Sequence, residues 1–551
     1  MKKKILECVP NFSEGRDMVI IKQITDEIES VEDVKLLDVD PGRDTNRTVV
    51  SFAGEPEAVA EAAFRAVRKA AEVIDMSRHR GEHPRMGATD VCPFIPVSGI
   101  SMEETVAIAR KVAERIGKEL QIPVFCYEKA AFNEKRRSLA YCRSGEYEGL
   151  EKKLSDPEWK PDFGPAVFNR KSGATAVGAR DFLVAFNVNL NTTSARRASA
   201  IAFDVRESGR DVFNDRGKKV KVPGSLRNVR AIGWFIREYG IAQVSMNLTN
   251  ISETPVHIAF DEVCRKAEAR GIRVTGSELV GLIPLKSLLE AGKYFLEKQN
   301  RSTGLPDKEL IHIAVRSMGL DDLQPFRAEE KIIEYLLEEK KEELVSLSLK
   351  EYMDLTASEQ PVPGGGSALA YMGALGVALG TMVANITGHR RGWDERWKEF
   401  SDQAAEGTKI QNMLLRLVDA DTAAYNKIIE ARRLSKSGKK ERDYRNTAIQ
   451  NAYKQAVLVP LQLMETAYSG FKIVKSMTET GKSSLVTDAA VGSFALLACI
   501  KSAHLNIKTN VEGVEDREFI SEVLARAAKI EEEAVLLQEN ILSEANRRVS
   551  L

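Results

Sequence analysis

The run FLVAFNVNL, Phe182–Leu190, decides the fold, because it begins the second of two similar series of strand-like and helical segments in the chain. Its apolar residues are typical of a strand. Helical and strand-like patterns follow it in the order helix, strand, strand, helix, strand: Ser194–Ser208, Val229–Phe235, Ala242–Leu248, Pro255–Arg270 and Val274–Val280. This βαββαβ order predicts an α+β unit in which helices cover a sheet.

The N-terminal part of the chain shows a similar order. Its strand-like and helical runs are Ile5–Val9, Met18–Ile28, Val34–Asp40, Thr48–Phe52, Glu55–Ile74, Met102–Ile116 and Val124–Tyr127. Two successive units of this kind predict two ferredoxin-like subdomains that face each other across a cleft. We expect these subdomains at residues 1–180 and 181–326.

The pattern changes after Phe326. Ala328–Leu344 is a charged helical run, and we interpret residues 327–346 as a linker. From 347 to 551 long helical patterns dominate, which predicts an all-α bundle. The expected architecture is therefore multidomain, with two α+β ferredoxin-like (βαββαβ) subdomains followed by an all-α helical bundle.

Length and composition narrow the class of protein. The 551 residues exceed what one hydrophobic core holds, which excludes a single domain. Eighty basic and eighty acidic side chains cancel, so composition gives no case for nucleic-acid or membrane-surface binding. The six cysteines are scattered without a CxxC pair, and the N-terminus lacks the apolar core of a signal peptide. We expect a cytoplasmic protein.

One uncharged stretch, Ser367–Thr387, is nearly long enough to span a bilayer. Its residues are mostly alanine and glycine, which are weakly hydrophobic. We therefore predict a helix buried inside the bundle and no membrane span. Small residues such as Gly373 and Gly376 would let neighbouring helices approach closely.

Charged and titratable residues are densest in Asp75–Val97, DMSRHRGEHPRMGATDVCPFIPV. His79-Arg80-Gly81-Glu82-His83 matches H-x-x-E-H, a zinc motif that requires a continuous helix. The central glycine and Pro84 oppose such a helix. A loop histidine among carboxylates can instead carry a proton, because its pKa lies near neutrality. A structural histidine is the alternative.

Two arginines of this block, Arg78 and Arg85, are candidates for holding the carboxylates of an acidic substrate. Ordinary surface charges are the alternative interpretation.

Two motifs stand out in the bundle. Pro361–Ser367, PVPGGGS, leads into a helix, and its glycine amides can approach an anion or a polar ring. The motif lacks the Gly-Lys-Ser/Thr ending of a P-loop, so nucleotide hydrolysis is not expected. The alternative to ligand binding is that these glycines only cap the helix and allow close packing. Asp419 and Asp421 point about 200° apart on a helix. They cannot chelate one metal, so one can face a site while the other is solvated or caps a helix.

Together these strings resemble the formimidoyltransferase-cyclodeaminase family, the two-activity folate enzymes of histidine breakdown. ECVPNFSEG, LLDVD, TNRTV, SRHRGEHPRMGATDVCPFIPV and PDFGP…GATAVGAR resemble the glutamate formimidoyltransferase part. PVPGGGS, LVDAD and SLVTDAA resemble the cyclodeaminase part, and stand-alone methenyl-folate cyclohydrolases share them. The resemblance covers essentially the whole chain.

The resemblance implies that N-formimidoyl-L-glutamate gives its formimidoyl group to N5 of tetrahydrofolate. The second domain then cyclises the product to 5,10-methenyltetrahydrofolate and releases ammonia. It implies tetrahydrofolate, polyglutamylated, as a substrate, with no metal and no nucleotide. It also implies a homo-oligomer, a ring of dimers forming an octamer.

The resemblance assigns roles to residues. His83 matches the general base of the transfer, and Asp40 the carboxylate that orients it or stabilises its charge. Asp421 matches the proton acceptor of the cyclisation. The folate-binding segment comprises Gly164, Pro165, Ala166, Val167, Phe168, Asn169, Arg170, Lys171, Ser172 and Gly173. In the bundle the candidate folate contacts are Gly364, Gly365, Gly366, Lys482 and Asp488, of which the last two can equally be helix-end charges.

Glu278, in GSELVGL, stands where vertebrate members of the family have glutamine. If it touches the amino-acid substrate, donor specificity can differ, since a carboxylate repels a substrate carboxylate unless it is protonated or bridged by Arg or Lys.

Three alternatives stay open. The closest is a glutamate formyltransferase fused to a methenyltetrahydrofolate cyclohydrolase-like domain. The others are a non-catalytic folate-binding scaffold and a zinc hydrolase.

Overall fold

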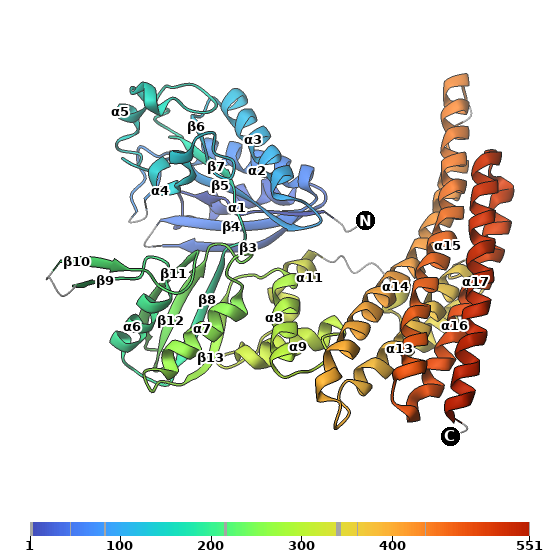
Figure 1. The fold of residues 1–551 in the computed structure, drawn as a ribbon. Coiled ribbons are helices and arrows are strands. Elements are labelled where there is room, and N and C mark those ends of the chain that lie inside the picture. Colours follow the sequence, from blue (N-terminus) through green and yellow to red (C-terminus); the bar gives the residue numbers. More distant parts are fainter. Residues whose placement is uncertain are drawn as a thin grey trace. The chain divides into compact units, whose positions relative to one another are not determined.

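The computed structural model describes residues 4–43, 46–81, 84–213, 218–337, 343–360, 362–435 and 437–549. The chain divides into two compact units. The first contains Met1–Leu288 and Met318–Glu338, and the second Leu289–Ser317 and Glu339–Leu551. The first unit is α/β and the second is helical (Figure 1). This confirms a multidomain chain with an α/β N-terminal region and a helical C-terminal region.

The first sheet of the α/β unit contains seven strands. Its elements are β1 (Ile5–Cys8), β2 (Asn11–Phe12), α1 (Met18–Glu29), β3 (Val34–Gly42), β4 (Arg47–Gly54), α2 (Pro56–Val73), β5 (Thr89–Ser98), α3 (Met102–Glu119), β6 (Val124–Glu128), α4 (Leu139–Cys142), α5 (Leu150–Leu154) and β7 (Thr175–Ala179). Strands β3, β4, β1 and β5 lie side by side and antiparallel. The sheet continues through β7 to β6 in parallel pairing.

Strands β5 and β7 were not predicted from the sequence. We expected Val124–Tyr127 to complete the βαββαβ order, but β5 completes it, and β6 and β7 extend the sheet. Pro93 and Pro96 lie within β5, although proline is normally disfavoured in a central strand because it lacks a backbone donor. These prolines interrupt the strand pattern in the sequence, so the strand was not recognised. Because β5 contains the last part of the polar block Asp75–Val97, those residues lie within the sheet.

Helices α1, α2 and α3 supply one side of the first core. They bury residues such as Ile24, Val59 and Ile116 against apolar strand residues, including Phe52 and Phe94. The spacing of the buried residues follows the helical repeat. This packing helps to hold β5, the interior strand in which the polar block ends, in place.

The second sheet has the strand order β11-β12-β8-β13, antiparallel throughout. Its elements are β8 (Val184–Leu190), α6 (Ala195–Val205), β11 (Val229–Ile236), β12 (Ile241–Leu248), α7 (Val256–Glu268) and β13 (Val274–Val280). Every predicted element of this region is found, with small differences in its ends. A separate hairpin of β9 (Arg210–Phe213) and β10 (Lys219–Val222) was not predicted.

Four long helices and α13 form the bundle (Figure 1). The helices after β13 are α8 (Leu285–Lys298), α9 (Asp307–Met318), α10 (Ala328–Lys331), α11 (Ile333–Leu337), α12 (Leu349–Thr356), α13 (Gly365–Thr387), α14 (Trp397–Arg433), α15 (Lys439–Thr480), α16 (Val486–Asn510) and α17 (Arg517–Val549). Short 3-10 turns are η1 (Glu134–Arg137), η2 (Pro157–Trp159), η3 (Leu344–Ser346), η4 (Asp394–Arg396), η5 (Ser483–Leu485) and η6 (Val511–Gly513).

Helix α13 is the uncharged stretch of the sequence, and it packs closely on its neighbours. A methyl group built on Gly373 would lie 2.9 Å from the Cys499 sulfur, and one on Gly376 would lie 2.8 Å from the Gly492 carbonyl oxygen. Glycine therefore permits the close approach of α13 and α16.

Two helical stretches of the described chain, 365–387 and 483–513, are long and apolar enough to cross a membrane. Within the bundle, 56% and 44% of their most apolar windows are buried. This is weak evidence for a span, because core helices of soluble proteins pass the same test.

Candidate functional sites

His79 lies in the polar block between α2 and β5, in a segment outside any helix. Its Nδ1 accepts a hydrogen bond of 3.2 Å from Nε of Arg85, and its Nε2 lies 2.8 Å from the Asn46 carbonyl oxygen. Because arginine only donates, Nε2 carries the ring proton. Burial lowers the pKa of His79, so the ring is neutral at neutral pH.

Arg85 is buried and holds this region together. Its guanidinium donates two hydrogen bonds, of 2.8 and 2.6 Å, to the Glu148 carboxylate, and Glu146 lies 3.4 Å away. Hydrogen bonding to Glu148 raises the pKa of Arg85. Arg85 is therefore occupied by protein carboxylates. Arg78, the other arginine considered for substrate, is exposed and lies 3.5 Å from Asp75.

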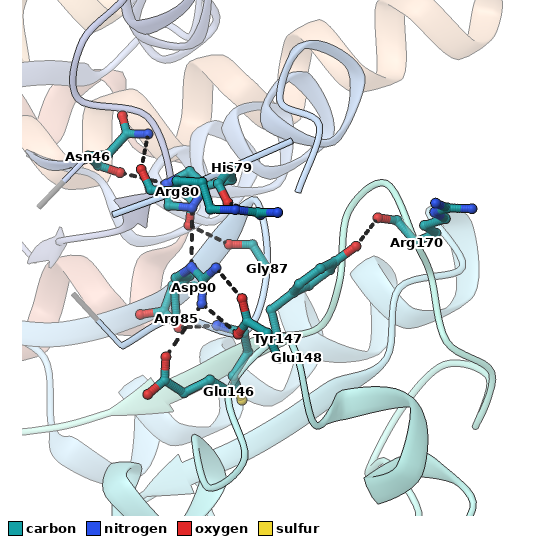
Figure 2. A network of polar contacts seen from close by, with 12 residues as sticks. Asn46, His79, Arg80, Arg85, Gly87, Asp90, Glu146, Tyr147, Glu148 and Arg170 are labelled. Carbon is teal, nitrogen blue, oxygen red and sulfur yellow. Dashed lines mark hydrogen bonds and ion pairs between the residues drawn. The ribbon is translucent and has the colours of Figure 1, made fainter. Parts of the chain in front are cut away.

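The folate-binding segment predicted at 164–173 joins the same network (Figure 2). The Tyr147 main-chain N–H donates to the Arg85 carbonyl, and its hydroxyl donates to the Arg170 carbonyl at 2.5 Å. The Tyr147 ring also contacts Phe168, with 5.4 Å between ring centroids. The structure thus joins three motifs that are far apart in the sequence.

Main-chain hydrogen bonds fix the end of this segment. The Met76 N–H donates to the Lys171 carbonyl, and the Ala88 N–H to the Ser172 carbonyl. Met76 and Ala88 lie on either side of His83 in the sequence. His83 itself lies outside the described residues. Its flanking chain is therefore tied to the predicted folate segment on both sides.

Positive φ angles mark the two ends of the segment. Gly164 has φ of 82°, and a methyl group there would lie 2.3 Å from the Ile122 carbonyl oxygen. Gly173 has φ of 68° and would place a methyl 2.1 Å from the Met86 carbonyl oxygen. Both positions therefore require glycine. Between them Ala166, Val167, Arg170 and Lys171 are exposed, whereas Pro165, Phe168 and Asn169 are half-buried and Ser172 is buried.

Asp40 lies exposed on β3, opposite Val49 of β4. Its charge acts on Arg47, a side chain that was not singled out in the sequence. Burial lowers the pKa of Arg47, and the charges of Asp90 and Asp40 oppose that change. The Arg47 Nε is buried without a hydrogen-bond partner among the described residues. The Arg47 side chain is half-buried and its Nη2 donates to Asn11, so the unpaired Nε is a donor that remains for binding an anion.

Glu278 lies on β13, half-buried, in the sheet of the second subdomain. Its Oε2 is 3.3 Å from Nδ2 of Asn187 and 3.5 Å from Nε2 of Gln243. The buried amides were missed in the sequence. The signal was the alternation of Asn187 and Asn189 with apolar residues in VAFNVNL, which places both on one face of a strand.

The bundle brings together two motifs, because Asp421 of α14 lies against the first turn of α13. A methyl group built on Gly366 would lie 2.2 Å from the Asp421 carboxyl carbon. Burial raises the pKa of Asp421, and the nearby main-chain N–H of Ser367 opposes this change. Gly364 caps α13 without a side chain, and a methyl on Gly365 would meet open space.

Of the pair Asp419 and Asp421, Asp419 is the residue that caps a turn. Its carboxylate accepts a 2.8 Å hydrogen bond from the Leu344 N–H at the start of η3. The Ser367 hydroxyl donates to the Val418 carbonyl at 2.8 Å and so fixes α13 on α14. Asp421 therefore faces the glycine-rich turn while Asp419 caps a turn elsewhere.

Asp488 is not brought to Asp421 within the chain. Helices α13 and α16 are antiparallel, because Gly373 faces Cys499 and Gly376 faces Gly492. At 1.5 Å per residue, Asp488 lies roughly 20 Å along α13 from Gly366. Lys482 is also at the far end, where its N–H donates to the Thr387 hydroxyl at 3.0 Å.

No cluster of three or more metal-ligating side chains occurs among the residues that the structure describes. Both ring nitrogens of His79 are already hydrogen-bonded. In this arrangement His79 offers no nitrogen to the zinc ion that the H-x-x-E-H spacing suggests.

Three domain families match the chain in order. They are the formiminotransferase domain, N-terminal subdomain, at residues 5–180, the formiminotransferase domain at 185–338, and formiminotransferase-cyclodeaminase at 348–529. Formimidoyltransferase-cyclodeaminase of Gallus gallus is 42% identical over 533 residues, or 96% of this chain and 97% of the relative.

Shorter relatives match each half separately. Glutamate formimidoyltransferase of Streptococcus pyogenes is 42% identical over 54% of this chain and 95% of its own length. Methenyltetrahydrofolate cyclohydrolase of Methylorubrum extorquens is 29% identical over 37% of this chain and 98% of its own length. Separate relatives of the α/β unit and of the helical bundle, each named for an enzyme activity, indicate a bifunctional enzyme. The chain belongs to the formimidoyltransferase-cyclodeaminase family.

Proposed function

We propose that this chain is a bifunctional folate enzyme of histidine degradation. It transfers the formimidoyl group of N-formimidoyl-L-glutamate to N5 of tetrahydrofolate, then cyclises 5-formimidoyltetrahydrofolate to 5,10-methenyltetrahydrofolate with release of ammonia. The observation that carries the proposal is the similarity along 96% of the chain to a relative named for both activities. Tetrahydrofolate, polyglutamylated, is the substrate shared by the two steps.

In the transfer, N5 attacks the formimidoyl carbon and loses its proton, and the bond from that carbon to the glutamate nitrogen breaks as the leaving amine gains a proton. We assign the removal of the N5 proton to His83, which returns it to the leaving amine, with Asp40 orienting or charge-stabilising the base. Support comes from the main-chain bonds that tie both flanks of His83 to Lys171 and Ser172 of the folate segment. His79 has a structural role, because both of its nitrogens are used within the protein.

In the cyclisation, N10 attacks the formimidoyl carbon and the departing nitrogen gains protons to leave as ammonia. A group that carries a proton near neutral pH serves this step. Burial raises the pKa of Asp421, which supports its role as proton acceptor. The adjacent Gly364, Gly365 and Gly366 are proposed contacts of the folate ring, and Gly365 is the exposed one of the three. Asp488 and Lys482 are proposed contacts at the other end of α13.

The finer architecture belongs to the same proposal. The strand orders β3-β4-β1-β5 and β11-β12-β8-β13 support a ferredoxin-like assignment for the subdomains at 1–180 and 181–326. A linker at 327–346 and a cyclodeaminase domain at 347–551 complete the proposed domains. We further propose a cytoplasmic homo-oligomer, an octameric ring of dimers, which needs no metal or nucleotide.

A coupled assay tests the proposal. The purified chain is mixed with tetrahydrofolate and N-formimidoyl-L-glutamate, and methenyl-folate absorbance and ammonia are followed together. Both products appearing in step support two activities in one chain. The alternative, formyl transfer coupled to a cyclohydrolase step, predicts methenyl-folate from N-formyl-glutamate without ammonia, and that result would replace the proposal. A scaffold without activity gives no product from either donor.

A further inference from the structure

A chain of amide and carboxylate side chains crosses the second sheet on the face away from its helices. Phe186 of β8 packs against Phe260 of α7, with ring centroids 6.5 Å apart. Successive side chains of a strand point to opposite faces. Asn187 and Asn189 therefore lie on the other face, together with their cross-strand neighbours Glu278 and Gln243.

Hydrogen bonds join these side chains in one line. Nδ2 of Asn189 donates to Oδ2 of Asp322 at 3.0 Å, and Nε2 of Gln243 donates to Oδ1 of Asn189 at 2.8 Å. Nε2 of Gln243 also lies 3.5 Å from Oε2 of Glu278, which accepts from Asn187 at 3.3 Å. The line has a carboxylate at Asp322 and another at Glu278.

The line fixes the orientation of the Gln243 amide. A carboxylate only accepts, so Asp322 requires the Asn189 amide nitrogen, which turns Oδ1 of Asn189 toward Gln243. That oxygen requires the nitrogen of Gln243 in turn. The remaining oxygen, Oε1 of Gln243, is buried without a partner among the described residues, and Gln243 is only 1% exposed. An unsatisfied buried acceptor costs free energy, which a ligand donor recovers.

Glu278 offers a second acceptor on the same face of the sheet, because its hydrogen bonds within the described part of the chain are made by Oε2 and leave Oε1 available. We propose that Gln243 and Glu278 together bind a planar N–C–N group that presents two N–H donors. Both substrates of the proposed function carry such a group. They are the formamidinium of N-formimidoyl-L-glutamate and the 2-amino, N3–H edge of the pterin ring. The inference rests on the proposed function and deepens it.

This polar face is directed toward the first subdomain. Arg230 pairs with Asn247 and Trp234 with Gln243, so Arg230 and Gln243 share a face of the sheet. The charge of Arg230 acts on the carboxyl of Glu128 in β6 of the first subdomain. The acceptor pair therefore faces the subdomain that contains the His79 network and the folate segment.

The test uses Glu278→Gln in the full-length protein, with Glu238→Gln in the exposed turn before β12 as the matched control. KM and kcat of the transfer are measured for each substrate, with the formimidoyl and the formyl donor. We expect Glu278→Gln to raise one KM at least tenfold. A higher KM for N-formimidoyl-L-glutamate, but not for its formyl counterpart, identifies the formamidinium as the group bound. A higher KM for tetrahydrofolate with either donor identifies the pterin.

Asp322→Asn is the second variant, because it removes the carboxylate that orients Asn189 and Gln243. We expect it to raise the same KM by a smaller factor while kcat changes little. A kcat of the transfer close to that of the wild type reports that the α/β unit is folded, and ammonia release from 5-formimidoyltetrahydrofolate reports that the bundle is intact. Both KM values within twofold of wild type in Glu278→Gln, with ammonia release preserved, would overturn the inference. No transfer by the wild-type protein would instead mean that the proposed function is wrong.

Discussion

Asp421 combines a cost in stability with a proposed role in proton transfer. Burial raises its pKa, so the ionised carboxylate is disfavoured in the folded state at neutral pH. A neutral side chain of the same shape does not pay the free-energy cost of burying an ionised carboxylate. We expect Asp421→Asn to reduce ammonia release by about 100-fold or more and to raise the melting temperature at pH 8.

The gain in melting temperature should disappear below the unfolded-state pKa of aspartate, where the wild-type carboxyl is protonated in both states. Scanning calorimetry of wild type and variant at pH 8 and at acid pH measures this difference. Full ammonia release by Asp421→Asn would contradict the proposed role.

Gly366 leaves room for that carboxylate. A methyl group at this position would collide with Asp421 and displace either the carboxylate or the first turn of α13. We expect Gly366→Ala to lower ammonia release at least tenfold while formimidoyl transfer is unchanged. The control is Gly438→Ala at the start of α15, where a methyl meets open space. Equal effects of the two substitutions would show that the contact with Asp421 is unimportant.

At the scale of elements, the conformation of the proposed folate segment, 164–173, depends on the glycines at its ends. Gly164→Ala combines a strained positive φ with a collision against the Ile122 carbonyl. Gly271→Ala has a similar φ of 66° but open space, so it reproduces the strain alone. We expect only Gly164→Ala to raise the KM for tetrahydrofolate in the transfer, by about tenfold, the factor that corresponds to 1.4 kcal/mol. Steady-state kinetics of both variants checks this.

Strand β1 contains a buried acid, Glu7, whose pKa burial raises to about 7. Because the folded-state pKa is higher than the unfolded value, the folded state is destabilised as pH rises from about 4.5 through 7. The loss amounts to roughly 3 kcal/mol above pH 8. We expect Glu7→Gln to remove this part of the pH dependence, and the melting midpoint of the α/β unit between pH 5 and 8.5 measures it. An unchanged slope would show that Glu7 does not titrate in this range.

The sequence predicted elements well where periodicity was regular. The second sheet and the long bundle helices were predicted because apolar spacing decides both. Strand β5 was missed because Pro93 and Pro96 interrupt its pattern. In the sites, the contact of Asp421 with Gly366 and the network of His79, Arg85 and Glu148 join residues far apart in sequence. Local patterns carry no information on such contacts.

At the scale of the whole molecule, one chain contains two sites that belong to separate compact units. We expect His83→Ala to abolish the transfer and Asp421→Ala to abolish ammonia release, each leaving the other step intact. A mixture of the two purified variants should then convert tetrahydrofolate to methenyl-folate, because each supplies one working half. Loss of both steps in either single variant would show that the halves depend on each other.

The loop Ser302–Gly304 precedes the proposed linker at 327–346, yet it belongs to the unit that contains the bundle. The Thr303 N–H donates to the Ser401 hydroxyl at 3.0 Å, and the Gly304 carbonyl accepts from Asn385 and Thr408. A gene split at the linker would leave this loop on the transferase polypeptide without its three bonding partners. A cut before Leu289 would in turn leave Met318–Glu338, which belongs to the α/β unit, on the polypeptide of the bundle, so neither of these two cuts leaves both units whole.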